Sequence, residues 1–321
     1  MHFRRLGESG LVVSALGLGC NNFSARVDQE QATAIVDACF DTGVNLFDTA
    51  DYYGDSEVFL GKALKGRRDD AVIATKFGLD LQGRLGQDLG ARGSRRYIRR
   101  AVEESLRRLD TDYIDLYQQH LPDSRTPIAE TLSALTDLVH EGKVRYIGSS
   151  NMTGWQLADA DWTARTSHLE RFVSAQNEHN LLDRRSEDLL PACRRFGVGL
   201  LAWYPLANGL LTGKYRRDEA PPAGARLTDE AIPWHHNQPK QQDMLTPEAF
   251  ARIEALERFA GEREVTLLEV ALGGLVAQPG VGAALAGASR PEQVRSNAKG
   301  VSWVPTADDL KALRTVMNAT R

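Results

Sequence analysis

One strand–helix–strand unit decides the fold class, and it occupies residues 114–148, IDLYQQHLPDSRTPIAETLSALTDLVHEGKVRYIG. It opens with an apolar run at residues 114–120, continues as a helical segment at 127–141 and closes with a second apolar run at 144–148. Near-continuous apolar strands that alternate with helices are typical of a parallel sheet covered on both faces. The unit therefore predicts parallel strands joined by a helix.

The same alternation extends over most of the chain. Eight apolar runs are predicted as strands, at residues 15–19, 44–47, 71–76, 114–120, 144–148, 172–176, 198–204 and 283–287. The helices that follow them are predicted at residues 30–41, 56–64, 94–109, 127–141, 154–165, 186–196, 248–272 and 291–299. Eight β/α repeats favour an α/β fold closed into a (β/α)8 TIM barrel, with a doubly wound open sheet as the alternative.

The two ends of the chain add little to this plan. Residues 3–6 and 11–13 flank the turn-rich Gly7-Glu8-Ser9-Gly10 and predict an N-terminal β-hairpin. No proline- or serine-rich linker divides the chain, so we expect a single domain over residues 1–321.

Helix ends carry local signals. Thr126 before Pro127 predicts a cap followed by a first-turn proline, and Thr153 with Gln156 has the spacing of a capping box. Residues 110–112 and 141–143 are predicted as helix exits.

Composition limits the function classes. The 39 basic and 43 acidic residues give a net charge of −4, which argues against a nucleic-acid-binding protein. Cys20, Cys39 and Cys193 form no CxxC motif and leave one cysteine over in any disulfide pairing, so we expect a reducing cytoplasm.

Targeting and membrane signals are weak. The first eight residues lack the apolar core of a signal peptide. Residues 270–289 are free of charge, but Gln278-Pro279-Gly280 interrupts them, so we predict a buried helix, a turn and a buried strand with no membrane span.

One long segment lacks periodicity. Residues 216–245 contain four prolines and many charges and follow the seventh predicted strand. In a barrel this places them at the C-terminal face of the strands, where active sites form, so we predict a flexible lid over the substrate. A surface insert without a role is the alternative.

Several common motifs are missing. Residues 17–22, GLGCNN, begin like the GxGxxG dinucleotide motif but lack its third glycine. The chain has no GxxxxGK[ST], GxSxG or HExxH. His235 and His236 stand in the charged loop without a third ligand nearby, so we predict solvated histidines and no metal site.

Charged and polar residues instead gather at the predicted strand ends. The second run is followed by Asp48 and Tyr53, the third ends in Lys76, and the fourth ends in His120. Adjacent strands lie about 4.8 Å apart, so in-order pairing would bring these four side chains to one patch. Each alone has an ordinary explanation: a helix cap for Asp48, rim packing for Tyr53, a solvated strand end for Lys76 and a core histidine for His120.

Together the four residues suggest carbonyl chemistry. A free tyrosine titrates near pH ~10, and an ammonium within ~4–6 Å favours its ionised form and lowers its pKa. An aspartate keeps that ammonium charged, and a histidine donates to an oxygen that gains charge. Such a set can protonate a carbonyl oxygen while hydride reaches the carbon, and since no side chain donates hydride, we expect a nicotinamide cofactor.

Four segments resemble the aldo-keto reductase family. They are residues 47–57, FDTADYYGDSE, residues 74–78, ATKFG, residues 116–123, LYQQHLPD, and residues 142–151, GKVRYIGSSN. The resemblance extends from the N-terminal hairpin to Asn297. It implies that Tyr53, and not its neighbour Tyr52, is the general acid, that Asp48 and Lys76 tune it, and that His120 orients the carbonyl.

The resemblance also implies a set of residues that bind NADP(H). Ser150, Asn151 and Gln176 would hydrogen-bond the nicotinamide carboxamide, and Tyr204 would stack on the ring. The remaining cofactor residues would be Gly19, Cys20, Asn21, Pro205, Leu206, Gly209, Leu211, Lys214, Gly287, Ser289, Arg290, Gln293 and Asn297. Lys214 follows glycines of a pyrophosphate-covering loop, and Ser289 with Arg290 at a helix start suits the extra 2′-phosphate of NADP(H).

Three functions follow from the sequence. The first is NADPH-dependent reduction of an aldehyde or ketone without a metal, acting on a small-molecule carbonyl substrate. The second is a cofactor-binding regulatory or redox-sensing subunit with little turnover, and the third is a lyase or isomerase that forms a Schiff base on Lys76. We expect Phe23, Trp234 and the 216–245 loop to determine substrate specificity. His179 stands where relatives commonly carry tyrosine. The sequence leaves the substrate and the oligomeric state open.

Overall fold

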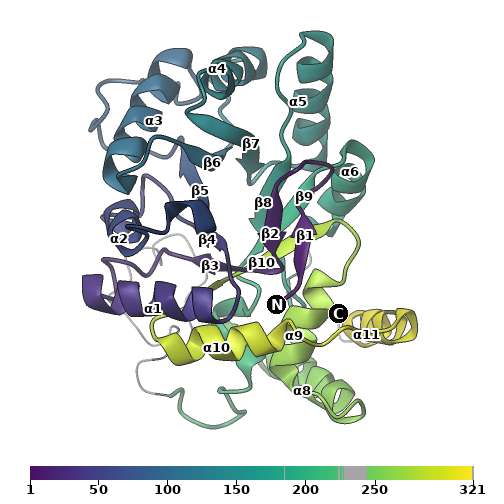
Figure 1. Ribbon diagram of the computed structural model, residues 1–321. Helices are drawn as coiled ribbons and strands as arrows, with labels where there is room; N and C mark the ends of the chain where they lie inside the picture. Colours follow the sequence, from purple (N-terminus) through teal and green to yellow (C-terminus); the bar gives the residue numbers. More distant parts are fainter. Residues whose placement is uncertain (184, 223–224, 226, 228–243, 320–321) are drawn as a thin grey trace.

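The computed structural model describes residues 1–183, 185–222, 225, 227 and 244–319. In this part of the chain eight parallel strands close into a barrel, with β10 paired to both β3 and β9 (Figure 1). The strands are β3 (Leu16–Gly19), β4 (Leu46–Asp48), β5 (Val72–Phe77), β6 (Ile114–Gln119), β7 (Val144–Ser150), β8 (Ser174–Glu178), β9 (Gly199–Trp203) and β10 (Val281–Gly287). The predicted barrel is confirmed and the open sheet is excluded.

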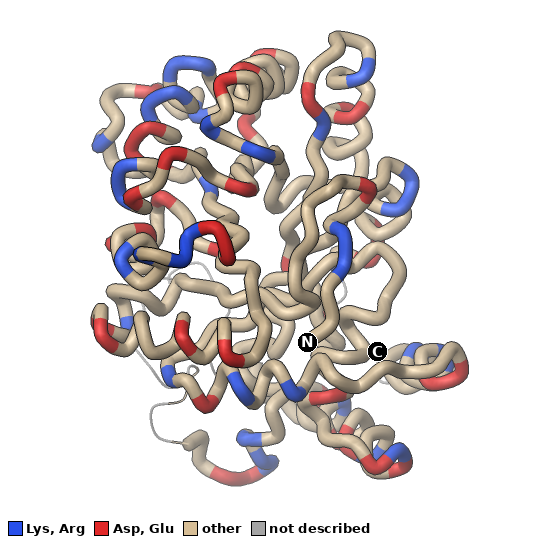
Figure 2. The backbone as a smooth tube through the Cα atoms, viewed as in Figure 1, with Lys and Arg blue, Asp and Glu red and all other residues tan. Residues whose placement is uncertain are grey.

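Helices cover the outside of the barrel. They are α1 (Gln29–Asp41), α2 (Ser56–Ala63), α3 (Arg95–Leu109), α4 (Ile128–His140), α5 (Gly154–Thr166), α6 (Leu189–Phe196), α8 (Pro247–Gly261), α9 (Leu267–Val276), α10 (Pro291–Gly300) and α11 (Ala307–Ala319). Short 3-10 turns are η1 (Arg68–Asp70), η2 (Arg185–Asp188) and η3 (Ala207–Thr212). In Figure 2 both signs of charge are mixed along these outer helices, while the strands carry few charged residues.

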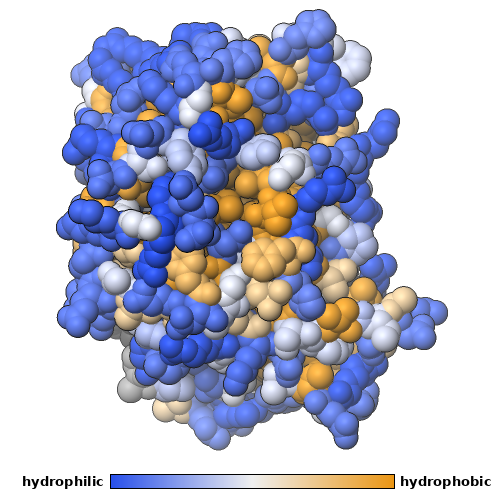
Figure 3. All heavy atoms as spheres, viewed as in Figure 1, coloured by the Kyte–Doolittle hydropathy of each residue, from blue (hydrophilic) through white to orange (hydrophobic). Residues whose placement is uncertain are grey.

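The N-terminal hairpin closes one end of the barrel. It consists of β1 (Phe3–Arg5) and β2 (Val12–Ser14), paired antiparallel as predicted. Leu6, Leu11 and Val13 are buried in one cluster with strand residues that point into the barrel, such as Leu46 and Leu116. In Figure 3, which views this end, hydrophobic side chains gather near the centre around the hairpin and hydrophilic ones cover the periphery.

Two predictions about the helices are wrong. The helix expected at residues 248–272 is two helices, α8 and α9, because Glu264 adopts a left-handed backbone with φ 56° and Thr266 starts α9 with a capping box. Pro127 is itself the N-cap of α4, with extended ψ of 137° and no side-chain cap, so Thr126 does not cap that helix. Both errors concern where a helix begins, which local backbone geometry decides.

Other local predictions are confirmed. Thr153 and Gln156 form the capping box of α5, and Asp110 ends α3 in a left-handed conformation with φ 52°. The charge-free residues 270–289 contain the end of α9 and buried strand β10. None of the helices described is long and apolar enough to span a membrane.

Most of the predicted lid, including Trp234, His235 and His236, lies outside the described residues. The lid therefore stays a prediction. One helix, α11, was not predicted from the sequence; it follows the last predicted helix and packs against α8.

Candidate active site

A cavity of about 560 Å³ opens at the C-terminal ends of the barrel strands. Most of the predicted site residues line it, namely Gly19, Asn21, Asp48, Tyr53, His120, Ser150, Asn151, Gln176, Tyr204, Pro205, Leu206, Gly209, Lys214, Gly287, Ser289, Gln293 and Asn297. Four predicted residues do not line the cavity: Cys20, Lys76, Leu211 and Arg290. Lys76 lies directly behind it, whereas Arg290 is exposed at the start of α10.

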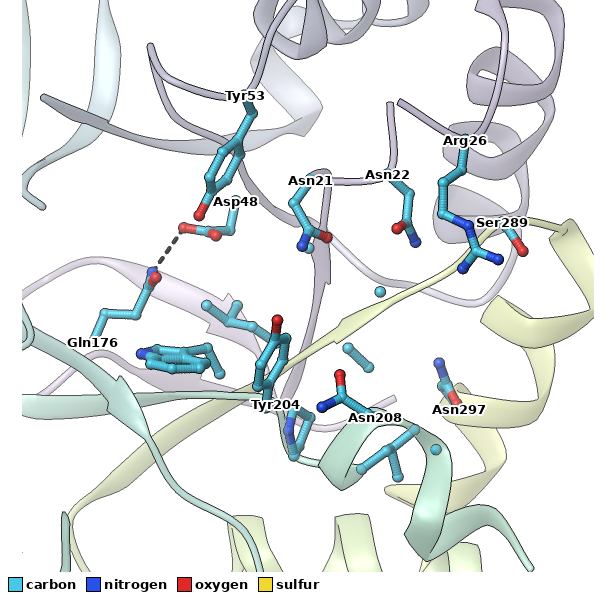
Figure 4. A pocket seen from close by; sticks show the side chains of 18 of the residues that line it. Asn21, Asn22, Arg26, Asp48, Tyr53, Gln176, Tyr204, Asn208, Ser289 and Asn297 are labelled. Atoms are coloured by element: carbon cyan, nitrogen blue, oxygen red, sulfur yellow. Dashed lines mark hydrogen bonds between the residues drawn. The ribbon is translucent and has the colours of Figure 1, made fainter. Parts of the chain in front are cut away.

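The strand register explains why the catalytic candidates meet. Gly19, Asp48 and Ala74 are partners across β3, β4 and β5, and Lys76 lies two residues beyond Ala74 on the same side of the strand. Lys76 is fully buried, and its Nζ lies 2.8 Å from both carboxylate oxygens of Asp48 and 2.8 Å from the carbonyl oxygen of Thr49. Gln176 Nε2 donates to Asp48 Oδ1 at 2.7 Å, which joins β8 to the same cluster (Figure 4).

Lys76 is held in its charged form. Burial alone would lower the pKa of this ammonium, but the charge of Asp48 and the nearby Tyr53 raise the pKa above its ordinary value. A Schiff base requires a neutral amine, so this environment argues against covalent chemistry on Lys76.

Tyr53 lies between Lys76 and His120. The Lys76 Nζ is 5.1 Å from the centre of the Tyr53 ring, and the rings of Tyr53 and His120 meet edge-on with centroids 5.8 Å apart. Burial raises the pKa of the Tyr53 phenol above its ordinary value, although the Lys76 charge lowers it. The expected net lowering of the Tyr53 pKa is therefore wrong, because desolvation outweighs the effect of the ammonium, and the phenol keeps its proton at neutral pH.

His120 is neutral. Burial, and then the Lys76 charge, hold the pKa of its imidazole well below the ordinary value. The buried Nδ1 has no hydrogen-bond partner in the described protein. A neutral imidazole can donate a hydrogen bond to a carbonyl oxygen but does not carry a spare proton at neutral pH.

A second buried carboxyl group lies behind these residues. Asp51 is 1% exposed, and neither of its carboxyl oxygens has a hydrogen-bond partner in the described protein. Burial and the neighbouring Glu57 raise the pKa of Asp51 to about 8, against the charges of Arg108, Arg84 and Lys76. Glu57 differs, because Thr75 Oγ1 at 2.6 Å and Arg108 Nε at 2.7 Å both donate to it.

Polar groups next to these catalytic candidates form a connected set on β7 and β8. Ser150 Oγ donates to the carbonyl oxygen of Gln176 at 2.8 Å, and Asn151 Nδ2 lies 3.0 Å from both Ser150 Oγ and the carbonyl oxygen of His120. Asn151 has a left-handed backbone with φ 58°, and so does Tyr204 with φ 53°. Such conformations cost energy in residues other than glycine and occur often at functional sites.

The loop after β9 lies along the far wall of the cavity. Gly209 has φ 93°, a backbone conformation that favours glycine, and a Cβ built there would lie 2.6 Å from Lys214 Nζ, so the end of the Lys214 side chain lies against this loop. Asn208 is 7% exposed, and its Oδ1 has no partner in the described protein. Leu211 instead packs into the core beneath, and the Cys20 thiol donates weakly to the Leu18 carbonyl oxygen at 3.7 Å, so neither side chain reaches the cavity.

Ten further residues that the sequence pattern did not single out also line the cavity: Asn22, Arg26, Tyr52, Leu79, Leu121, Trp203, Asn208, Thr212, Leu285 and Ala286. Tyr52, Leu121 and Trp203 are direct neighbours of predicted residues, so the strand-end position was the signal that could have found them. Arg26 lies inside the loop before α1, and no periodic pattern marks it. His179, which departs from the family pattern, is fully buried, and its Nε2 lies 3.0 Å from Gln278 Oε1.

Comparison with known proteins identifies the family. The model of the Aldo/keto reductase family matches residues 15–318. The chain belongs to the aldo/keto reductase family. It is therefore an NAD(P)H-dependent oxidoreductase, in a family whose members generally reduce carbonyl groups.

Three relatives illustrate the range of names in this family. The chain is 38% identical to the "Uncharacterized oxidoreductase YrpG" of Bacillus subtilis (strain 168), over 98% of this chain and 96% of that protein. It is 33% identical to a "Probable voltage-gated potassium channel subunit beta" of Arabidopsis thaliana, over 95% and 92% of the two chains. A "Putative voltage-gated potassium channel subunit beta" of Schizosaccharomyces pombe (strain 972 / ATCC 24843) is also 33% identical, over 99% and 94%.

The cavity of this aldo/keto reductase suits a nicotinamide dinucleotide. It offers amide groups at one end, the aromatic Tyr204 on its wall, the unpartnered Asn208 Oδ1, and the cations Lys214 and Arg26. Among the described residues no group of three or more His, Cys, Asp or Glu side chains could hold a metal ion.

Proposed function

We propose that the protein reduces an aldehyde or ketone to an alcohol with NADPH, and that Tyr53 is the general acid. The observation that carries this proposal is the buried ammonium of Lys76, held by Asp48 at 2.8 Å and placed 5.1 Å from the centre of the Tyr53 ring. The ammonium stabilises the phenolate that remains after the proton has left, and its charge is fixed by Asp48.

Tyr53 and His120 have different roles at the carbonyl group of the substrate. When bound, NADPH would supply the hydride that the carbonyl carbon receives. Tyr53 donates its proton to the carbonyl oxygen, and the neutral His120 donates a hydrogen bond that orients the same oxygen. The raised pKa of Tyr53 keeps that proton in place until the oxygen gains negative charge.

The remaining assignments concern the cofactor. Ser150, Asn151 and Gln176 would hydrogen-bond the carboxamide, Tyr204 would stack on the nicotinamide ring, and Lys214 would bind the pyrophosphate. Ser289 and Arg290 belong to the segment that receives the adenosine end, and the positive charge of the cavity favours NADPH over NADH.

The substrate has an apolar part. Tyr52, Leu79, Leu121 and Trp203 line the cavity beside Tyr53 and His120 and present aromatic and aliphatic surface. We place the protein in the cytoplasm, because its three cysteines are free and buried.

The experiment is direct. The purified protein is mixed with NADPH and a panel of aromatic and aliphatic aldehydes and ketones, and oxidation of NADPH is followed by its absorbance. Consumption of NADPH matched by formation of the alcohol supports the proposal. Borohydride trapping of substrate on Lys76 would contradict it.

A second candidate function rests on the relatives named as potassium channel subunits. In that case the protein is a cofactor-binding regulatory subunit that turns over little substrate. Asp48, Tyr53, Lys76 and His120 are all present and assembled, which favours turnover. Tight NADPH binding without reduction of any carbonyl in the panel would favour the regulatory function instead.

A further inference from the structure

Arg26 stands in a tightly wound loop between β3 and α1. Its backbone N–H donates to the carbonyl oxygen of Asn22 at 2.8 Å, and Phe23 and Val27 on either side are buried and paired in a short bridge. These contacts fix the loop, so the direction in which the Arg26 side chain leaves the backbone is set by the fold.

The loop is also tied to the segment that precedes α10. Asn22 is 6% exposed, and its Nδ2 donates to the carbonyl oxygen of Ala288 at 3.2 Å. Arg26 and Ser289 both line the cavity, and Figure 4 shows them together at the end away from Tyr53 and Gln176. An anion at this end would therefore meet a guanidinium from one side and a serine from the other.

The positively charged side chains that line the cavity lie at two separate places, each of which could bind an anion. The described lining contains two arginine or lysine side chains, Arg26 and Lys214, and one carboxylate, Asp48, which is already neutralised by Lys76. Lys214 lies against Gly209 in the loop after β9, whereas Arg26 lies near Ser289. Arg290, the cation suggested by the sequence, is exposed and outside the lining.

We propose that Arg26, together with Ser289, binds the 2′-phosphate of NADP(H) and is the residue that makes the site prefer NADPH over NADH. The assignment rests on the proposed cofactor function. A planar guanidinium forms paired hydrogen bonds with a phosphate, which a lysine ammonium cannot match. NADH offers a hydroxyl at the same position, so it gains little from the arginine.

The test measures binding and not turnover. Quenching of tryptophan fluorescence gives the Kd of NADPH and of NADH for the wild type, Arg26→Gln, Arg26→Lys and the matched control Arg290→Gln. Glutamine keeps the length and packing of the arginine stem while removing the charge, and circular dichroism of each variant confirms folding. Adenosine 2′,5′-bisphosphate and 5′-AMP serve as probes of the adenosine end alone.

We expect Arg26→Gln to raise the Kd of NADPH by about 10- to 100-fold, because one or two charge-assisted hydrogen bonds are lost. The Kd of NADH should rise by less than about threefold. Arg26→Lys should lose less affinity for NADPH than Arg26→Gln does. Arg290→Gln should also raise the Kd of NADPH less than Arg26→Gln does. The bisphosphate should follow NADPH, and 5′-AMP should follow NADH.

Two results overturn the assignment while leaving the proposed function intact. They are equal losses of both nucleotides in Arg26→Gln, and a larger selective loss of NADPH in Arg290→Gln. A wild-type protein that binds neither NADPH nor NADH would overturn the proposed function and this assignment with it.

Discussion

The two ends of the cavity use cations in different ways. At the catalytic end Lys76 is fully buried, and three oxygen atoms lie 2.8 Å from its ammonium. At the other end Arg26 is partly exposed and Lys214 is exposed, and both are carried by loops. A buried charge held by fixed oxygen partners provides a fixed field for a neighbouring hydroxyl, whereas a cation exposed on a loop is screened by salt. The comparison predicts that changes at the catalytic end alter chemistry and stability, and that changes at the loops alter binding.

The largest expected effect is at Tyr53. Tyr53→Phe removes the proton donor and should lower kcat by about 10²- to 10⁴-fold, which is the usual contribution of general acid catalysis. The Kd of NADPH should stay within about twofold of the wild type, because the hydroxyl is aimed at the substrate. Steady-state kinetics and fluorescence titration measure the two quantities. Loss of NADPH binding together with turnover would break the separation between the two ends.

The ion pair of Asp48 and Lys76 should rank next. Lys76→Met and Asp48→Asn each leave one buried partner unmatched, so each should lower the free energy of unfolding by about 3–5 kcal/mol. The double variant should cost less than the sum of the two single changes, since no unpaired charge remains. Urea unfolding measures all four proteins. Additive losses would mean that the pair is not coupled.

Asp48 accepts hydrogen bonds from Lys76 and Gln176, whereas the carboxyl group of Asp51, three residues later, has no hydrogen-bond partner in the described residues. This difference predicts that Asp51 makes the stability of the protein depend on pH. The pKa of Asp51 is raised to about 8 in the folded protein, above the 3.8 of an ordinary aspartate. The folded state therefore holds the proton more tightly than the unfolded state, so this group's contribution to stability is full at low pH and is lost as pH rises toward about 8.

Asp51→Asn should flatten that part of the stability profile. Urea unfolding between about pH 5 and about pH 9 measures the slope for the wild type and for Asp51→Asn. A wild-type slope that survives in Asp51→Asn would show that another group titrates.

The smallest expected effect is at Leu121, at the opening of the cavity. Leu121 is 41% exposed and lines the cavity. Leu121→Ala should raise the KM for apolar aldehydes by about three- to tenfold, the worth of one or two buried methylene groups, and leave kcat nearly unchanged. Steady-state kinetics with a short and a long aldehyde measure the split. A fall in kcat instead would place Leu121 among the groups that orient the carbonyl.

The same contrast explains what the sequence could predict. Asp48, Lys76 and His120 end or follow buried strands, and parallel strands bring their ends together, so strand spacing was enough to predict their meeting. Arg26 was missed because its position depends on how one loop folds over Asn22. The net pKa of Tyr53 was predicted in the wrong direction, because burial and the Lys76 charge oppose each other and only the three-dimensional structure shows which is larger.

Helix boundaries show a similar limit. The apolar pattern of residues 248–272 continues through the break between α8 and α9, whereas the break itself depends on the left-handed Glu264 and the cap at Thr266. The apolar pattern of a sequence shows where a helix or strand lies but not the backbone conformation of a single residue. The strands of the barrel were therefore easier to predict than the ends of the helices.

The most direct test of the central claim follows one hydrogen atom. The wild-type protein is incubated in ordinary water with an aldehyde and with NADPH that carries deuterium at both hydrogens of the nicotinamide C4, and the alcohol is analysed by mass spectrometry. Hydride transfer with a proton from Tyr53 predicts one deuterium on the carbinol carbon and an ordinary hydrogen on the oxygen. An alcohol without deuterium on that carbon, or tightly bound NADPH with no alcohol formed, would contradict the account.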